Sequence, residues 1–289
     1  IGFFLSSVVL TTIASYLMLK YVKFSRFLDQ PNQRKIHTSV VPRFGGIPFS
    51  MCSMILSLLF VDFSAHYIWF AFSAFIIIFL GIMDDLYRID FKIKLVVQLF
   101  VGGLVFMQFF NQVPSFVFFD FDFSLPLWGV FVLFMVWFMG IVNSVNLIDG
   151  MDGLAGGAFF IICIGASFIG WMNQNVTFSM IYLIVMGSLM GFLFFNGKPA
   201  KFFMGDTGSL FLGFILAVMP LLFFVSQSSF ESLDLTPFII ISSYFIIDTL
   251  RVAFIRIVNN KNPLKPDKKH MHHDLLHTMN AYNRTLFFI

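Results

Sequence analysis

Charged residues are scarce in this sequence, and their scarcity argues against a soluble fold. Only 11% of the 289 residues are Asp, Glu, Lys or Arg, whereas 58% are hydrophobic and the mean hydropathy is +0.89. One soluble core could not hide so much apolar surface in a chain of this length. Low-complexity tracts and clear internal repeats are lacking too. We therefore expect a single integral-membrane domain over residues 1–289.

Cysteine and clustered positive charge are also nearly absent. The only two cysteines, Cys52 and Cys163, lie in apolar segments, which argues against a disulfide or a zinc site. The net charge of +3 is spread over connecting segments rather than gathered in one basic tract. Such a distribution fits a lipid bilayer with anionic headgroups and phosphate ligands, and it argues against nucleic acid as a partner.

Long apolar segments dominate what is present. Crossing the bilayer hydrocarbon takes about 20 helical residues, and shorter segments are accommodated by flanking residues or bilayer thinning. The chain has no initial Met and no visible cleavable signal, and its end, 285–289, reads as the start of another span, so we expect C-terminal truncation. The sequence thus predicts an all-α polytopic membrane protein with about ten transmembrane helices, the last truncated. Nine spans are nearly complete: approximately 1–19, 47–61, 67–83, 95–110, 127–142, 154–172, 178–195, 210–225 and 237–255.

Lysine and arginine are missing from every second gap between these spans. All 18 lie in the first, third, seventh and ninth gaps or on the approach to the last of them, and the fifth gap, on the same side, carries none. Short cytoplasmic loops retain Lys and Arg, so these gaps are expected to face the cytoplasm and the N-terminus to lie outside. The opposite gaps carry acidic residues instead: Asp62, Asp120, Asp122, Glu231 and Asp234.

The third cytoplasmic loop, 143–157, spaces carboxamides and carboxylates three residues apart. Asn143, Asn146, Asp149 and Asp152 follow one another with this spacing, and a glycine follows each of the two aspartates. At a helix end such positions share a face, so the side chains can converge. Oxygen ligands of this kind suit Mg²⁺, which completes its shell with water and substrate phosphates. The alternative is a solvated turn, but that leaves two acidic residues without a basic neighbour unexplained.

Two further loops place carboxylates beside apolar spans. Asp84 and Asp85 directly follow the span ending at Met83, where they could accept a proton, face a cation or merely end the helix. Asp206 lies between glycines before the span that begins at 210, where freed backbone amides could hold phosphate oxygens. Phe203 could stack on a base, although most of the 44 Phe residues are expected to pack or anchor in the bilayer.

The first and last loops carry basic side chains and histidines. Lys35, His37 and Arg43 precede a Pro-Arg-Phe-Gly-Gly turn and could bind phosphates, although the positive-inside bias alone would supply as many charges. The last loop holds three histidines, expected to donate hydrogen bonds to a sugar or diphosphate or to transfer protons rather than to bind zinc: His270, His272 and His273.

Within the last span, Asp248 and Arg251 lie near the cytoplasmic end. Their spacing suggests that they pair with each other. Charged residues inside membrane spans are functional candidates by default.

Taken together, five runs resemble the polyprenyl-phosphate N-acetylhexosamine-1-phosphate transferase family, a branch of glycosyltransferase family 4. The resemblance covers nearly the whole chain in order, and the HMHH run is most similar to the WecA/TagO branch, which uses UDP-N-acetylglucosamine. Two departures are small: Met271 stands where Ile is usual, and Asp85 is followed by Leu-Tyr-Arg rather than by a lysine, so Arg88 is a weak candidate for a catalytic cation. The runs are RKIH with PRFGG, DD, NSVNLIDGMDGLAGG, PAKFFMGDTGS and PDKKHMHH.

The resemblance implies transfer of N-acetylglucosamine-1-phosphate from UDP-N-acetylglucosamine to undecaprenyl phosphate, with release of UMP, at a bacterial cytoplasmic membrane. It implies Mg²⁺, replaceable by Mn²⁺, on Asp206 with Asn146, and Asp84 as the group that deprotonates or positions the lipid phosphate. Asp85 would support the site, and a homodimer is left open. The remaining roles implied are contact with uridine by Asp149 and Asp152, stacking on uracil by Phe203, binding of sugar diphosphate by His270, His272 and His273, and further substrate binding by Asn143, Asn146, Lys35, His37 and Arg43.

Other readings of the same residues remain open. The donor could be UDP-N-acetylmuramoyl-pentapeptide or another UDP-N-acetylhexosamine, and the sequence does not decide between direct attack and a covalent intermediate. We favour direct attack, because the lipid phosphate is already an oxyanion. A transporter or flippase of polyprenyl-linked sugars is the alternative from another class, but it would place charges near the bilayer midplane. An inactive scaffold is disfavoured, because every motif residue is present.

Overall fold

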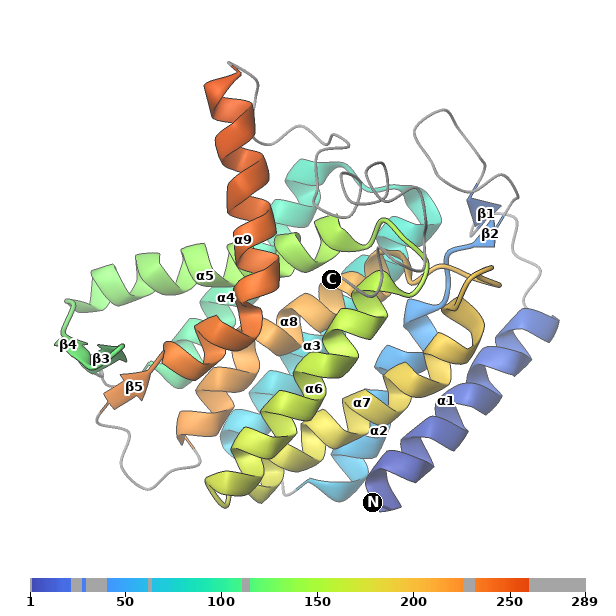
Figure 1. Ribbon diagram of the computed structural model, residues 1–289, viewed down its shortest axis with the longest axis horizontal. Coiled ribbons are helices and arrows are strands. Elements are labelled where there is room, and N and C mark those ends of the chain that lie inside the picture. The colour runs from blue at the N-terminus through green and yellow to red at the C-terminus, as the bar shows by residue number, and fades with distance from the viewer. Residues whose placement is uncertain are drawn as a thin grey trace.

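The structure, a computed structural model, describes residues 2–21, 28–29, 41–61, 64–110, 115–225 and 232–259. In these ranges it contains nine helices and two small sheets (Figure 1). The helices are α1 (Gly2–Tyr21), α2 (Gly46–Phe60), α3 (Ala65–Tyr87), α4 (Phe91–Phe109), α5 (Leu127–Ile148), α6 (Leu154–Met172), α7 (Val176–Asn196), α8 (Gly205–Val225) and α9 (Thr236–Val258).

The predicted class, a mainly helical protein with several membrane-length helices, is confirmed for the described residues. Eight of the described helices are long and apolar enough to cross a membrane, and α2, with 15 residues, is shorter. The total of about ten spans and the orientation of the N-terminus stay predictions, as does the reading of the chain as one truncated domain.

The helices at one end of the bundle extend further than the apolar segments do. We placed span ends at 83 and 142 and a span start at 210, whereas α3 runs to Tyr87, α5 to Ile148 and α8 begins at Gly205. Hydropathy marks where apolar side chains stop, but the helical hydrogen bonds continue for another turn wherever polar groups satisfy the helix end. Asp84, Asp85, Asn146 and Asp206 therefore lie on helix ends rather than on loops.

The strictly all-α prediction missed two small sheets. Strand β1 (Leu28–Asp29) pairs antiparallel with β2 (Val41–Pro42). Strand β3 (Ser115–Phe118) lies between β4 (Phe121–Phe123), which is antiparallel to it, and β5 (Ser232–Asp234), which is parallel. These strands are too short to give a clear period-two signal, and β5 comes from a distant part of the chain.

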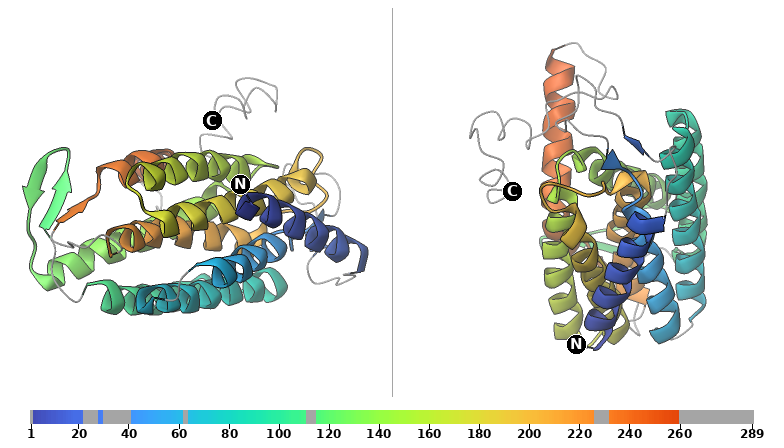
Figure 2. Two further views of the ribbon diagram at one scale, coloured as in Figure 1. Left: turned by 90° about the horizontal axis from the view of Figure 1, so that it is seen from below. Right: turned by 90° about the vertical axis from the view of Figure 1, so that its right-hand side faces the viewer.

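The two sheets lie toward opposite ends of the bundle, β1–β2 near one end and β4–β3–β5 at the other (Figures 1 and 2). Phe119 and Asp120 form the two-residue loop between β3 and β4, and both have positive φ, 45° and 64°. A hairpin loop of this kind matches the twist of its strands.

Helix α8 is the centre of the bundle. Almost all of its membrane-length window, 94%, is buried, and it packs against α2, α3 and α5. A helix surrounded by others is apolar on all sides, and close approach of membrane helices requires small residues. Gly81 of α3 lies directly against Thr207, and a Cβ on Gly213 would meet Val142 of α5 at 2.7 Å. These glycines let α3 and α5 hold the start of α8 in a fixed position.

Candidate functional site

The N-terminus of α8 is held by a carboxylate from another helix. Asp85, in the last turn of α3, is only 5% exposed. Its Oδ1 accepts a hydrogen bond from the Asp206 N–H at 2.8 Å, and its Oδ2 accepts from the N–H and the hydroxyl of Thr207 at 2.9 and 2.6 Å. A negative group at this position satisfies free N–H groups and opposes the positive end of the helix dipole. Asp85 therefore fixes where Asp206 lies.

Gly205 makes this docking sterically feasible. Its φ of +72° is a left-handed conformation that L side chains rarely adopt, and an added Cβ would lie 2.6 Å from an Asp85 oxygen. Any side chain at residue 205 would therefore push the carboxylate away from the helix end.

Asp84, the neighbour of Asp85, faces a different set of groups. The Lys94 Nζ lies 3.1 Å from Asp84 Oδ2 and 2.8 Å from Asp206 Oδ2, so one ammonium group bridges two carboxylates. The three side chains are 12–20% exposed, which leaves them open to a ligand on one side. The two carboxyl groups are also close enough to interact directly. Without positive charge between them they would repel each other.

The turn between α3 and α4 brings Lys94 back to Asp84. Arg88 ends α3 in a left-handed conformation with φ of 52°, and Asp90 caps α4 by accepting the Lys92 N–H at 2.9 Å. Lys94 is a functional candidate that the sequence motifs did not reveal, because the family resemblance pointed to a cation shortly after Asp85, where Arg88 lies. A basic residue in the first turns of the next helix, on the same side as the carboxylates, was the available signal.

Two asparagines of α5 lie at this end of the bundle. The Asn146 side-chain amide donates to Ser209 Oγ at 2.8 Å and also interacts with the Asp206 carboxylate. Asn143 is one turn further from the helix end, and its amide donates to the side chain of Gln98 in α4 at 2.9 Å and to the Met139 carbonyl at 2.8 Å. Asn146 therefore joins the carboxylate cluster, whereas Asn143 ties α5 to α4 beside it.

The loop that carries Phe203 is joined to the segment before α2 through its backbone. The Phe203 N–H donates to the Pro42 carbonyl at 2.8 Å, and the N–H groups of Gly45 and Gly46 donate to the carbonyls of Phe203 and Met204 at 2.9 and 2.7 Å. Phe203 is partly exposed, whereas Phe202 is fully buried. The structure thus leaves the Phe203 ring accessible.

Asp149 and Asp152 lie in the connection between α5 and α6. Burial, and after it the negative charge of Asp206, raises the pKa of Asp149 to about 7, while Arg43 acts in the opposite direction. Asp152 accepts a hydrogen bond from the Ala200 N–H at 3.3 Å, and so links this connection to the loop before α8. Arg43 and Asp206 therefore lie near enough to Asp149 to act on the pKa of its carboxyl group.

Several predicted site residues lie outside the described part of the chain: Lys35, His37, His270, His272 and His273. The structure brings together Asp84, Asp85, Asn146 and Asp206, from α3, α5 and α8. Asp248 of α9 is fully buried, and its pairing with Arg251 stays a prediction.

The donor set at the cluster suits a hard divalent cation. Within the described ranges, no group of three or more His, Cys, Asp or Glu side chains is arranged to hold a metal ion. Two carboxylates and an amide nevertheless meet here, and Mg²⁺ commonly takes only one or two carboxylates from the protein, with water and phosphate oxygens as its other ligands. The residues therefore fit Mg²⁺ together with a phosphate substrate, and they do not form a closed protein cage.

Comparison with known proteins identifies the family. The model of glycosyl transferase family 4 matches residues 67–224, which include every element of the carboxylate cluster. The chain therefore belongs to this family, and the resemblance seen in the sequence motifs is confirmed.

Three relatives are informative. A Bacillus subtilis protein called a probable undecaprenyl-phosphate N-acetylglucosaminyl 1-phosphate transferase is 39% identical over 86% of this chain and 69% of its own length. A Thermotoga maritima protein called an undecaprenyl-phosphate alpha-N-acetylglucosaminyl 1-phosphate transferase is 33% identical over 94% of this chain and 78% of its own length. The Escherichia coli K12 protein of the same name is 27% identical over 91% and 72%.

Proposed function

We propose that this protein transfers N-acetylglucosamine-1-phosphate from UDP-N-acetylglucosamine to undecaprenyl phosphate and releases UMP. An oxygen of the lipid phosphate attacks the phosphorus bonded to the sugar, and the bond from that phosphorus to the UMP oxygen breaks. The products are UMP and a diphosphate-linked lipid. The observation that carries the proposal is the bridging of Asp84 and Asp206 by Lys94 beside Asn146, in a chain whose relatives are named for this reaction.

The electrostatics of the cluster suit the joining of two anions. Both substrates carry negative phosphates, so their approach requires positive charge at the point of contact. Lys94 supplies one such charge. Mg²⁺, or Mn²⁺ in its place, held by Asp206 with Asn146 and facing Asp84, would offset further negative charge and orient the phosphate oxygens.

Asp84 and Asp85 have different roles in this proposal. Asp84 touches the acceptor phosphate, which it deprotonates or positions. Asp85 is a positioning residue, because its oxygens already accept hydrogen bonds from the start of α8. No protein nucleophile is needed, since the acceptor is itself an oxyanion.

The donor nucleotide is assigned to the neighbouring loops. Phe203 stacks on uracil with its accessible ring, and Asp149 and Asp152 organise the uridine side. Arg43, Lys35, His37 and Asn143 bind or orient the phosphates, and the histidines of the last loop hold the sugar diphosphate: His270, His272 and His273.

The site is proposed to face the cytoplasm of a bacterial cell, where UDP-sugars are made. The support is the positive-inside pattern of the sequence, because Lys and Arg are confined to alternate gaps between the apolar segments, on the same predicted side as the carboxylate motifs. The N-terminus would then lie outside the cytoplasm.

The direct test measures UMP release by detergent-solubilised protein supplied with undecaprenyl phosphate, Mg²⁺ and a panel of UDP-N-acetylhexosamines. We expect turnover with UDP-N-acetylglucosamine, and a loss of roughly 10²–10³-fold in Asp206→Asn and in Asp84→Asn, as is typical when a group that stabilises transition-state charge is removed. Asp122→Asn, on an exposed strand at the opposite end, is the matched control and should keep wild-type turnover. Normal turnover in both site variants would overturn the assignment, and turnover only with another donor would change the sugar.

A further inference from the structure

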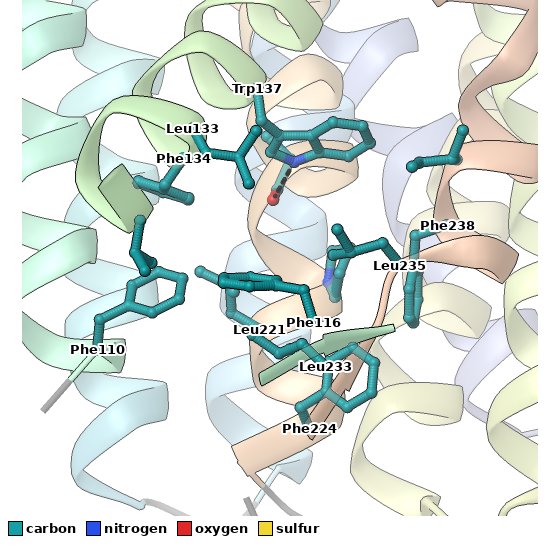
Figure 3. A pocket seen from close by; sticks show the side chains of 14 residues that line it. Phe110, Phe116, Leu133, Phe134, Trp137, Leu221, Phe224, Leu233, Leu235 and Phe238 are labelled. Carbon is teal, nitrogen blue, oxygen red and sulfur yellow. Dashed lines mark hydrogen bonds between the residues drawn. The ribbon is translucent and has the colours of Figure 1, made fainter. Parts of the chain in front are cut away.

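An apolar cavity lies at the end of the bundle opposite the carboxylate cluster. It has a volume of about 130 Å³ and lies among α5, α8, α9 and the strands β3 and β5 (Figure 3). All the described side chains that line it are hydrophobic, and its one side-chain polar atom, Trp137 Nε1, is occupied by a hydrogen bond to the Ala217 carbonyl at 3.1 Å. A cavity of this kind offers water no hydrogen-bond partner, so it favours a hydrocarbon ligand.

The cavity opens sideways, between α5 and α9. Its floor is formed by buried residues of α8 such as Ala217 and Leu221, whereas Leu133 at its margin is 38% exposed and Ile239 is partly exposed. In a membrane that side faces the bilayer hydrocarbon. A hydrocarbon chain can therefore enter from the lipid without crossing water.

The cavity and the carboxylate cluster share two helices. Along α8, the lining residues from Ala217 to Phe224 lie eleven to eighteen residues after Asp206, a separation of about 16–27 Å at the rise of an α-helix. Along α5, the lining residues from Trp137 back to Val130 lie nine to sixteen residues before Asn146, or about 14–24 Å. A lipid whose phosphate is at the cluster can thus follow α5 and α8 to the cavity.

The acceptor of the proposed reaction has the length to reach it. One isoprene unit contributes four main-chain carbons and spans about 4–5 Å when extended. Eleven units therefore measure roughly 50 Å, more than the bilayer hydrocarbon thickness of about 30 Å. The middle of the cavity, about 20 Å from the carboxylate cluster, is then reached by roughly the fourth or fifth unit from the phosphate. An engineered apolar cavity of about 150 Å³ holds benzene, so a volume of this order suits one branched C5 unit.

We propose that this cavity is a binding site for an isoprene unit in the middle of the acceptor tail, and that it makes the protein favour long polyprenyl phosphates. The inference rests on the proposed function, since that function supplies the lipid. An acceptor with three isoprene units would reach the carboxylate cluster but not the cavity, and this difference makes the site testable separately from the chemistry.

The kinetic test fills the mouth of the cavity with a larger side chain. Leu133→Trp is compared with wild type and with Val136→Trp, an outward position on the same helix that is 67% exposed and does not line the cavity. We expect Leu133→Trp to raise KM for the eleven-unit acceptor roughly tenfold while KM for the three-unit acceptor changes less than about twofold. Val136→Trp should change neither. Equal changes with both acceptors, no change with either, or a wild-type KM independent of tail length would each overturn the proposal.

A binding measurement separates failure of this proposal from failure of the proposed function. Cysteine replaces Leu133 or Val136, and its labelling by a maleimide is followed in detergent, where the native Cys52 and Cys163 are buried. Eleven-unit polyprenyl phosphate should slow labelling at residue 133 but not at residue 136, and neither three-unit polyprenyl phosphate nor phosphatidylglycerol should protect either position. Protection by phosphatidylglycerol would mean an ordinary bilayer chain as occupant and would overturn the proposal. Protection by the long lipid alone, in a protein that releases no UMP with any donor, would reject the function and retain the tail site.

Discussion

The two ends of the helical bundle are built from opposite kinds of side chain, although the same helices run through both. At one end, α3, α4, α5 and α8 converge with three carboxylates, a lysine and an asparagine that take part in ion pairs and hydrogen bonds between the helices. At the other end, α5, α8 and α9 meet the strands around an aromatic cavity with one occupied polar atom. Polar groups give directional contacts that hold reacting atoms in place, whereas apolar contacts hold a chain without fixing its orientation. The proposed transfer reaction takes place at the first end, and the proposed site for the acceptor tail lies at the second.

The largest expected effect comes from removing the carboxylate that caps α8. Asp85→Ala leaves two backbone N–H groups and the Thr207 hydroxyl without their acceptor, so we expect a loss of about 3–5 kcal/mol in the free energy of unfolding. Thermal or denaturant unfolding of the detergent-solubilised protein measures it. Asp90→Ala, which removes a cap at the exposed start of α4, should cost only about 1 kcal/mol. Equal losses in the two variants would contradict the central role of Asp85.

A second substitution tests the charge balance within the cluster. Lys94→Met leaves Asp84 and Asp206 facing each other without the ammonium that bridges them, so we expect turnover to fall roughly 10–100-fold, or about 1.4–2.7 kcal/mol of transition-state stabilisation. Raised Mg²⁺ should restore part of the loss, because a second cation can replace the missing charge. Lys92→Met, at an exposed position on the same helix, is the control and should behave like wild type. A similar loss in Lys92→Met would show that general positive charge, rather than the bridge, matters.

The pH dependence of stability tests the burial of Asp149. Burial raises the pKa of this carboxyl from 3.8 to about 7, so the folded protein retains a proton that the unfolded chain has lost between these pH values. Ionising Asp149 therefore destabilises the fold as pH rises through this window, and the penalty is complete above the folded pKa. With Mg²⁺ chelated, Asp149→Asn should raise the melting temperature at pH 8 by on the order of 2–4 °C and by progressively less toward pH 5.

The matched control for that measurement is Asp122→Asn, since Asp122 is exposed on β4. Its difference from wild type should not vary over the same pH range. A pH-independent difference for Asp149→Asn would show that the charge of Asp149 is not penalised in the folded protein.

The smallest expected effect on stability comes from a substitution at the apolar end of the bundle. Trp137→Phe removes the hydrogen bond to the Ala217 carbonyl but keeps an aromatic ring in the cavity wall, so we expect a loss of about 0.5–1.5 kcal/mol in the free energy of unfolding. Trp128→Phe, at a position that is 73% exposed at the same end, should change stability less. A loss as large as that of Asp85→Ala would contradict the contrast between the two ends.

The membrane class and the polar motifs were readable from the sequence, because both are local properties. Long apolar runs predict spans, and Asn146 and Asp206 differ sharply from their apolar surroundings. The predicted ends of the helices were less accurate than the predicted spans themselves, since α8 begins five residues before the predicted span. That extra turn depends on Asp85, which comes from a helix more than a hundred residues earlier, and no local pattern records it.

Lys94 and the three-stranded sheet are two features that could not be predicted from the sequence. In the sequence, Lys94 is indistinguishable from the other basic residues of the positive-inside pattern. In the structure, the turn at Arg88 places α4 beside α3 and so brings Lys94 to Asp84. In the sequence, the residues of β5 resemble a polar connection between spans, whereas in the structure they pair with β3. In both cases the decisive partner is remote in sequence, so its identity depends on packing.

The sequence by itself determined that this protein is a helical membrane protein of the transferase family, because hydropathy, charge asymmetry and motif order are written residue by residue. Only the tertiary structure decided that Lys94 bridges Asp84 and Asp206, that Asp85 accepts hydrogen bonds from the start of α8, and that α5, α8 and α9 enclose an apolar cavity. The physical reason is that hydrogen bonds, ion pairs and cavities are made between segments, and their short range makes them depend on how the helices pack.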